Sequence, residues 1–157
     1  MMRHTRFSIG VAALAVVLGG HASSGAQQKP SAAAKPIEAE VFLTPTCGCC
    51  GKWVQHLEAA GFKVKRTVTT ELDSVPARQR VPSQLRSCHT AAIGKYLVEG
   101  HVPADLIKRL LREKPDVLGI AVPGMPIGSP GMEGPRPRPY SIVSFKADGT
   151  TDEFARR

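Results

Sequence analysis

The sequence has few aromatic residues, which make up 5% of its 157 positions, and it contains no internal repeats. Its formal net charge of +8 raises the question of nucleic-acid binding. The basic residues are scattered, however, and there are few aromatic rings to stack on bases. We therefore expect no nucleic-acid partner and interpret the charge as a solvated basic surface. The length leaves room for one domain and a targeting segment.

A long hydrophobic run is also missing, because the apolar stretch Phe7–Leu18 is too short to span a bilayer with margin. Arg3 and Arg6 precede this stretch, and the small residues Ser24-Gly25-Ala26 offer a cleavage site. We predict that residues 1–26 form a secretory signal peptide, with an uncleaved membrane anchor as the alternative. The lack of a cysteine near this site disfavours a lipoprotein. The mature protein is then expected in the periplasm, without stable membrane insertion.

Apolar periodicity is absent from residues 27–36, which are rich in Pro, Ala and Lys and are predicted to form a flexible linker. The folded domain is predicted to span residues 37–157, which is long enough for a modest core without a disulfide. The four cysteines are therefore available for another purpose. Export would place them in an oxidising compartment, where unprotected thiols tend to pair.

The start of the domain predicts a strand, a helix and a second strand. Ile37–Leu43 contains β-compatible residues and ends at Thr44-Pro45. Cys50–Ala60 carries apolar residues at helical spacing, and Gly61 is suited to close that helix. Phe62–Val68 alternates apolar and basic residues, as half-buried strands do. These elements predict a right-handed βαβ unit with parallel strands.

The rest of the domain predicts one clear helix among strands and loops. A strand is expected over Thr90–Val98, and an amphipathic helix begins near Pro103 and ends before Pro115. The other predicted elements are short helical turns in Glu71–Arg86, a short apolar run at Val117–Val122, an irregular loop over 123–139, and strands at Tyr140–Phe145 and Thr151–Phe154 around Asp148-Gly149. This order predicts an α/β, thioredoxin-like fold, with a central mixed sheet flanked by helices and a C-terminal β-hairpin.

Three of the four cysteines lie in the motif CGCC, between the first strand and the first helix. Cys47 and Cys50 form a C-x-x-C pair whose spacing is compatible with a disulfide, as in a redox dithiol. Cys49 does not fit that interpretation, because a third thiol beside a redox pair invites disulfide shuffling. A Cys49–Cys50 bridge would be strained, since adjacent Cα atoms are only about 3.8 Å apart.

Crowded thiolates are better suited to copper than to zinc. A tetrahedral zinc ion normally uses more widely separated ligands. Cu(I) tolerates low coordination numbers and favours cysteine and methionine, so several Cu(I) ions can share bridging sulfurs. Bound copper would also protect the thiolates from pairing. We therefore favour more than one Cu(I) ion per chain at this motif.

Cys88, in RSCHTAA, is the fourth sulfur and directly precedes the predicted strand Thr90–Val98. If that strand lies beside Ile37–Leu43 in the sheet, Cys88 comes close to the CGCC loop. The alternative is structural, with one disulfide between Cys49 and Cys88 and another within the C-x-x-C pair.

Four motifs in order, over about Ile37–Phe154, resemble the bacterial CopG-type copper-resistance family. They are CGCC after a strand, SCHTA, EGHVP before a helix, and GIAVPGMPIGSPGME. The resemblance implies a thioredoxin-like fold and a polynuclear Cu(I)–thiolate site in an exported protein. The family's C-x-C-C cysteines correspond to Cys47, Cys49 and Cys50, and its distal cysteine corresponds to Cys88. Copper redox conversion or detoxification is the role that the resemblance implies.

Met125, Met132 and His89 are the candidate supporting ligands. The methionines flank the GMPIGSPGM loop and are soft donors, although hydrophobic anchoring of the loop is an equal alternative. His89 adjoins Cys88 and could bind or tune copper, or serve as a cap. For His101, which precedes a helix, hydrogen bonding to the backbone is expected instead.

Two functions of different class follow from these residues. The first is a periplasmic protein that binds Cu(I) and works with other copper-handling proteins. The second is a thiol–disulfide oxidoreductase that uses Cys47 and Cys50. Thioredoxin-like redox enzymes usually present a cis-proline opposite the dithiol. At the equivalent position this chain has Ser87-Cys88-His89-Thr90 without a proline, and a sulfur there favours metal binding over disulfide exchange. Pro82 or Pro123 supplying that turn is the alternative.

Overall fold

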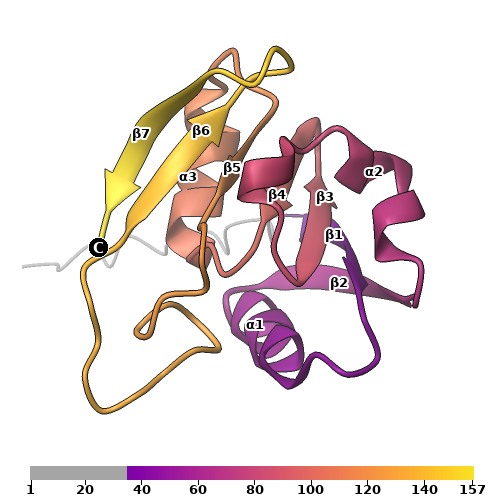
Figure 1. Ribbon diagram of the computed structural model, residues 1–157, viewed down its shortest axis with the longest axis vertical. Coiled ribbons are helices and arrows are strands. Elements are labelled where there is room, and N and C mark those ends of the chain that lie inside the picture. Colours follow the sequence, from indigo (N-terminus) through magenta and orange to yellow (C-terminus); the bar gives the residue numbers. More distant parts are fainter. Residues whose placement is uncertain (1–34) are drawn as a thin grey trace, which may run out of the picture. The chain divides into compact units, whose positions relative to one another are not determined.

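The computed structural model describes residues 35–157 (Figure 1). The predicted signal peptide at 1–26 and residues 27–34 of the predicted linker lie outside the described residues. No helix within 35–157 is long and apolar enough to cross a membrane.

The described part begins with the predicted βαβ unit. Strand β1 (Ile37–Leu43) alternates buried and less buried residues, helix α1 spans Gly48–Ala59, and strand β2 spans Phe62–Val68. β1 and β2 pair in parallel, as predicted. Gly61 joins α1 to β2 with a φ of +88°, the left-handed conformation that glycine adopts at little cost. Helix α1 begins two residues earlier than predicted, so Cys49 and Cys50 lie in its first turn and Cys47 precedes it as the N-cap.

The predicted single strand Thr90–Val98 is wrong, because this segment folds back on itself. It forms β3 (His89–Ile93) and β4 (Tyr96–Glu99), which pair antiparallel. The reversal occurs at Gly94, whose φ of +59° suits a tight turn between two strands. β3 also pairs antiparallel with β1, which places the start of β3 beside the end of β1.

The remaining elements complete a seven-stranded mixed sheet in the order β2-β1-β3-β4-β5-β6-β7. They are the short helices η1 (Leu72–Ser74), α2 (Pro76–Gln79) and η2 (Ser83–Leu85), helix α3 (Ala104–Glu113), and strands β5 (Gly119–Ala121), β6 (Ser141–Phe145) and β7 (Thr151–Arg156). β4 and β5 are parallel, whereas β6 is antiparallel to both β5 and β7. The architecture is therefore mixed α/β.

Both faces of the sheet are covered. On one face, Trp53 and Leu57 of α1 and Ile107 and Leu110 of α3 are fully buried in one apolar cluster. On the other face, the segment with α2 and η2 packs a smaller cluster against the sheet, whose members are Val81, Leu85, Leu97, Ala121 and Phe145. The loop over residues 123–139, drawn in orange in Figure 1, connects β5 to β6 without regular structure.

Candidate metal centre

The N-terminus of α1 carries the three clustered cysteines. Cys47 is the N-cap residue, and its amide donates a hydrogen bond to the Thr44 carbonyl at 3.3 Å. Cys49 and Cys50 follow in the first turn, where Cys50 is fully buried and Cys49 is partly exposed. Cys47 and Cys50 form a disulfide across a Cα–Cα distance of 5.4 Å. Their C-x-x-C spacing was expected to permit this bond.

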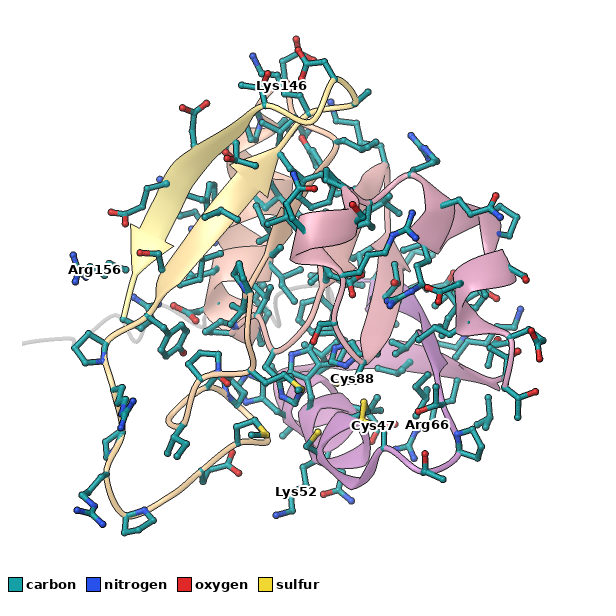
Figure 2. All side chains as sticks on the ribbon, in the orientation of Figure 1. Cys47, Lys52, Arg66, Cys88, Lys146 and Arg156 are labelled. Carbon is teal, nitrogen blue, oxygen red and sulfur yellow. A yellow bond between two sulfur atoms is a disulfide. The ribbon has the colours of Figure 1, made fainter. Side chains whose placement is uncertain are left out.

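The pairing of β3 with β1 brings Cys88 to the CGCC motif. In this pairing Leu43 lies opposite His89, so Cys88 is placed next to the loop that leads into α1. The sulfur atoms of Cys47, Cys49, Cys50 and Cys88 all lie within 4.8 Å of one another. Figure 2 shows yellow sulfur atoms gathered near the labels of Cys47 and Cys88. Four sulfurs from two separate segments therefore form one cluster.

Only part of this cluster is oxidised. Cys49 and Cys88 are free thiols, so of the two structural disulfides considered as an alternative only Cys47–Cys50 is formed. The Cys49 sulfur lies 3.5 Å from the Cys47 sulfur. The Cys50 sulfur lies 3.6 Å from the Cys88 carbonyl oxygen. Because the disulfide leaves Cys50 no proton, this second approach is a contact and not a hydrogen bond.

Two buried histidines point a ring nitrogen at the Cys88 sulfur. The distances are 3.7 Å from His89 Nδ1 and 3.6 Å from His101 Nε2. Each ring donates its other N–H to a backbone carbonyl, at 2.9 Å from His89 Nε2 to Gly100 and at 2.7 Å from His101 Nδ1 to Pro130. A carbonyl only accepts, so the nitrogen that faces the sulfur carries a lone pair. Metal-binding histidines are commonly oriented in this way.

The histidines are also held in the neutral state. Burial lowers the pKa of His89 to about 3, and it lowers the pKa of His101 as well. The position of His89 next to Cys88 was predicted, and its role as a ligand remains a prediction. His101 was expected only to bond the backbone. It does so, and it also faces the cluster, which its sequence context did not reveal.

The loop over residues 123–139 closes against this cluster at Gly131. With a φ of +84°, this glycine lies so close to α1 that an added Cβ would come within 2.8 Å of the Cys49 carbonyl oxygen and 2.9 Å of the Trp53 amide nitrogen. The ring of Trp53 in turn packs on His89, with centroids 4.3 Å apart. Glycine at this position therefore allows the loop to approach the cysteine helix.

The two candidate methionines lie in different surroundings. Met125 Sδ lies 3.5 Å from Cys88 Sγ, and its backbone has a φ of +47°, which is uncommon for a residue with a side chain. Met132 instead lines a hollow of about 580 Å³ together with Cys49, Lys52 and Glu133. Met125 is therefore at the cluster, whereas Met132 lies along an opening that leads to Cys49.

Cys88 must lose its thiol proton before its sulfur can bind a metal ion as a thiolate. The pKa of the Cys88 thiol is raised to about 11, mainly by burial and also by the nearby Cys49 thiol, against the lowering effect of the Ser87 hydroxyl. Cys88 is thus a neutral thiol at pH 7 in the metal-free protein. A soft metal ion would have to displace this proton in order to bind the sulfur.

Comparisons with known proteins agree on one family. The family model described as "Protein of unknown function, DUF411" matches residues 85–132. Two solved structures are titled "Copper resistance protein copG", forms 2 and 1, and both are 45% identical to this chain. The match covers 78% of this chain in both cases, and 99% and 98% of those chains, with TM-scores of 0.73 and 0.72. No curated protein sequence matches.

Proposed function

This chain belongs to the CopG-type copper-resistance family, and we propose that it binds Cu(I) in a polynuclear cluster of cysteine thiolates and serves copper resistance and homeostasis. The proposed bridging ligands are Cys47, Cys49, Cys50 and Cys88. The proposed supporting ligands are His89, His101, Met125 and Met132. More than one copper ion per chain is proposed, because bridging sulfurs are needed to use this many crowded donors.

The convergence of four sulfurs within 4.8 Å carries this proposal. A structural role would require only pairs of cysteines, yet Cys49 and Cys88 remain free beside the disulfide. Reducing the Cys47–Cys50 disulfide takes two electrons and two protons and provides two more sulfur ligands. The neutral histidines and the thioether of Met125 then add further soft or intermediate donors at the edge of the cluster.

The same sulfurs could also convert copper between oxidation states. Two Cu(II) ions would each accept one electron from the Cys47–Cys50 dithiol. The products would be two Cu(I) ions, the disulfide and two protons. The reverse direction would reload the dithiol at the expense of Cu(I). Both directions balance without any further reactant, so copper redox conversion belongs to the proposed function.

A thioredoxin-like fold and a periplasmic location are also part of this proposal. A thioredoxin-like fold with a C-terminal β-hairpin is supported by the βαβ unit, the antiparallel β3–β4 pair with α3 after it, and the antiparallel pairing of β6 with β7. A periplasmic location rests on the sequence of residues 1–26, for which we propose a signal peptide. Other periplasmic copper-handling proteins are the proposed partners.

Metal analysis combined with thiol counting tests the proposal. Protein that has been reduced and loaded with Cu(I) without oxygen should contain more than one copper per chain. Before reduction two thiols should be titratable, and afterwards four, in agreement with one disulfide and two free cysteines. Cys49→Ser should lower the copper count without preventing the disulfide. Absence of copper after loading the reduced protein would refute the proposed function.

A thiol–disulfide oxidoreductase is the second candidate, and the Cys47–Cys50 disulfide at the start of α1 favours it. Cys47 is partly exposed and could be attacked by an external thiol, while the buried Cys50 would be the leaving group at the helix N-terminus. Catalytic reduction of insulin disulfides, together with loss of that activity in Cys47→Ser, would support this candidate over copper binding.

A further inference from the structure

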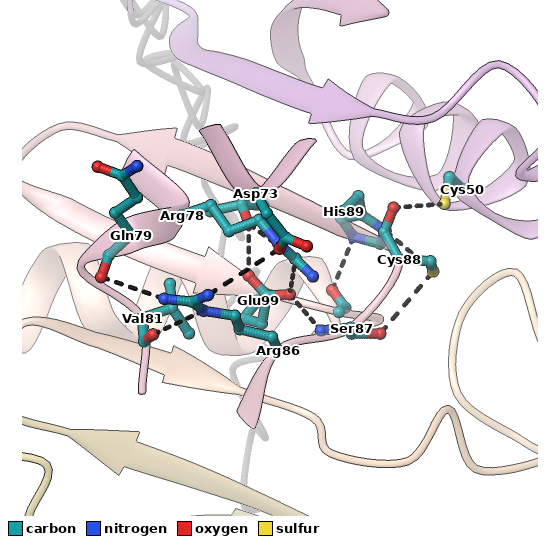
Figure 3. A network of polar contacts seen from close by, with 12 residues as sticks. Cys50, Asp73, Arg78, Gln79, Val81, Arg86, Ser87, Cys88, His89 and Glu99 are labelled. Carbon is teal, nitrogen blue, oxygen red and sulfur yellow. Dashed lines mark hydrogen bonds and ion pairs between the residues drawn. The ribbon is translucent and has the colours of Figure 1, made fainter. Parts of the chain in front are cut away.

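A buried carboxylate, that of Glu99, lies on the side of Cys88 that faces away from Cys50 (Figure 3). Glu99 ends strand β4, and its side chain is fully buried, as no other carboxylate within residues 35–157 is. It accepts three hydrogen bonds, from the Ser87 amide at 2.5 Å, from the Thr90 hydroxyl at 2.6 Å and from Arg78 Nη1 at 3.0 Å. Arg78 is also paired with Asp73, at 2.7 Å.

Stability alone does not account for this arrangement. Burying a carboxylate costs free energy that an ion pair recovers only in part, and apolar residues of similar size often serve the fold as well. The partners of Glu99 are more informative, because one of them is the backbone N–H of the residue directly before Cys88. A buried charge that binds a backbone amide fixes the position and direction of that peptide.

The residues after Glu99 hold Cys88 from its other side. The Gly100 carbonyl accepts the N–H of the His89 ring, and the Gly100 amide donates to the His89 carbonyl at 3.3 Å. His101 then faces the Cys88 sulfur. Consecutive residues of one segment therefore fix both neighbours of Cys88 and contact its sulfur. Within this segment, Glu99 is the residue that binds the backbone N–H of Ser87, the residue directly before Cys88.

We propose that Glu99 is a positioning residue that aims the Cys88 sulfur at the CGCC cysteines by fixing the Ser87 amide. This inference rests on the proposed copper function for its meaning, but its geometric content does not depend on copper. Arg78 pairs with the carboxylate at 3.0 Å, so the buried charge of Glu99 has a partner of opposite charge. The orientation of Cys88 is thereby set before any metal arrives, which lowers the cost of assembling the cluster.

Glu99→Gln tests the proposal, because it removes the negative charge and one of the two acceptor oxygens. The neutral amide can then hold the Ser87 N–H only by a bond without charge assistance. Thr90→Val is the matched control, since it removes a donor to the same carboxylate and leaves the Ser87 amide bond in place. All variants are made in a Cys49→Ser background. The disulfide-bonded protein then has Cys88 as its one free thiol.

The first measurement is the rate at which iodoacetamide alkylates Cys88 in the metal-free protein. A weaker hold on the Ser87 amide should make the sulfur more accessible, so Glu99→Gln should react roughly tenfold faster than the parent, and Thr90→Val within about twofold. The second measurement is Cu(I) affinity of the reduced protein in competition with a chromophoric chelator. Glu99→Gln should weaken it by about tenfold, as changes that disturb ligand orientation do.

Equal alkylation rates in the parent and Glu99→Gln would overturn the proposal, as would equal changes in Glu99→Gln and Thr90→Val. The latter result would mean that the network only stabilises the fold. If the wild-type protein with all four cysteines binds no copper, the proposed function fails while the alkylation comparison still decides the role of Glu99. Should Glu99→Gln fail to fold, Glu99→Asp, which keeps the charge but shortens its reach, is judged by the same comparison.

Discussion

Gly131→Ala is expected to weaken Cu(I) binding, because the loop backbone at this residue lies against the cysteine helix. An added Cβ would overlap the Cys49 carbonyl oxygen at 2.8 Å and the Trp53 amide nitrogen at 2.9 Å. Both atoms belong to the α1 backbone and cannot rotate away. The left-handed backbone costs an alanine roughly 1–2 kcal/mol. Relieving the overlap costs about 1–3 kcal/mol more.

Gly149→Ala separates these two costs. Gly149 has a φ of +85°, almost equal to the +84° of Gly131, but an added Cβ there meets no atom within 4 Å. This control should therefore lose only about 1–2 kcal/mol of unfolding free energy. In Gly131→Ala the additional cost displaces the loop, whose Pro130 carbonyl orients His101. Since 1.4 kcal/mol is a factor of ten, the Cu(I) affinity should fall roughly 5- to 150-fold.

Two measurements check this prediction. Urea unfolding followed by circular dichroism gives the free energy of unfolding of the wild type and both variants. Competition with a chromophoric Cu(I) chelator, under anaerobic and reducing conditions, gives their affinities. Gly149→Ala should bind Cu(I) as tightly as the wild type. If Gly131→Ala does so too, the loop takes no part in the site, and the reasoning from its close approach is refuted.

Three further results are expected. His101→Gln should lower the Cu(I) affinity about tenfold while thiol counts stay the same; an unchanged affinity would place this ring outside the site. Cys88→Ser should lower the copper count per chain of the reduced protein, and an unchanged count would exclude this sulfur from the cluster. His56 accepts the first N–H of α3 at 3.0 Å, and burial lowers its pKa against the opposing charges of Asp105 and Glu133. The neutral ring of His56 therefore stabilises the fold fully above about pH 6.5, and this contribution decreases as the pH falls. His56→Ala lacks the contribution at any pH, so its stability, measured by urea unfolding, should decrease less on acidification than that of the wild type.

The βαβ unit was predictable because its signals are local. The bounds of β1 and β2 agree with the alternation of side chains in Ile37–Leu43 and Phe62–Val68. The β3–β4 turn was missed because the apolar residues on the two sides of Gly94-Lys95 were interpreted as one run belonging to a single buried strand. A glycine inside such a run was the available signal, since it adopts a positive φ.

In the candidate site, too, some residues could be placed from the sequence and others could not. Cys88 could be placed near the CGCC motif from a single assumption, the pairing of its strand with β1, and that pairing is confirmed. His101 could not, because its approach to Cys88 depends on the reversal at Gly94 and on Pro130, 29 residues further along the chain. In the sequence, Glu99 is an ordinary polar residue directly after a predicted strand. Only its burial and its hydrogen bond from the Ser87 amide, seen in the structure, distinguish it.

The disulfide and the proposed copper site would compete for the same sulfur atoms, which connects the two candidate functions. The Cys47–Cys50 bond occupies two of the four sulfurs, so in this form only Cys49 and Cys88 could act as thiolate ligands. Reduction would make the other two available within a scaffold whose histidines are already oriented. Copper capacity would thus follow the redox state of one dithiol. In the proposed function, electron transfer to or from this dithiol would therefore set how much copper the protein holds.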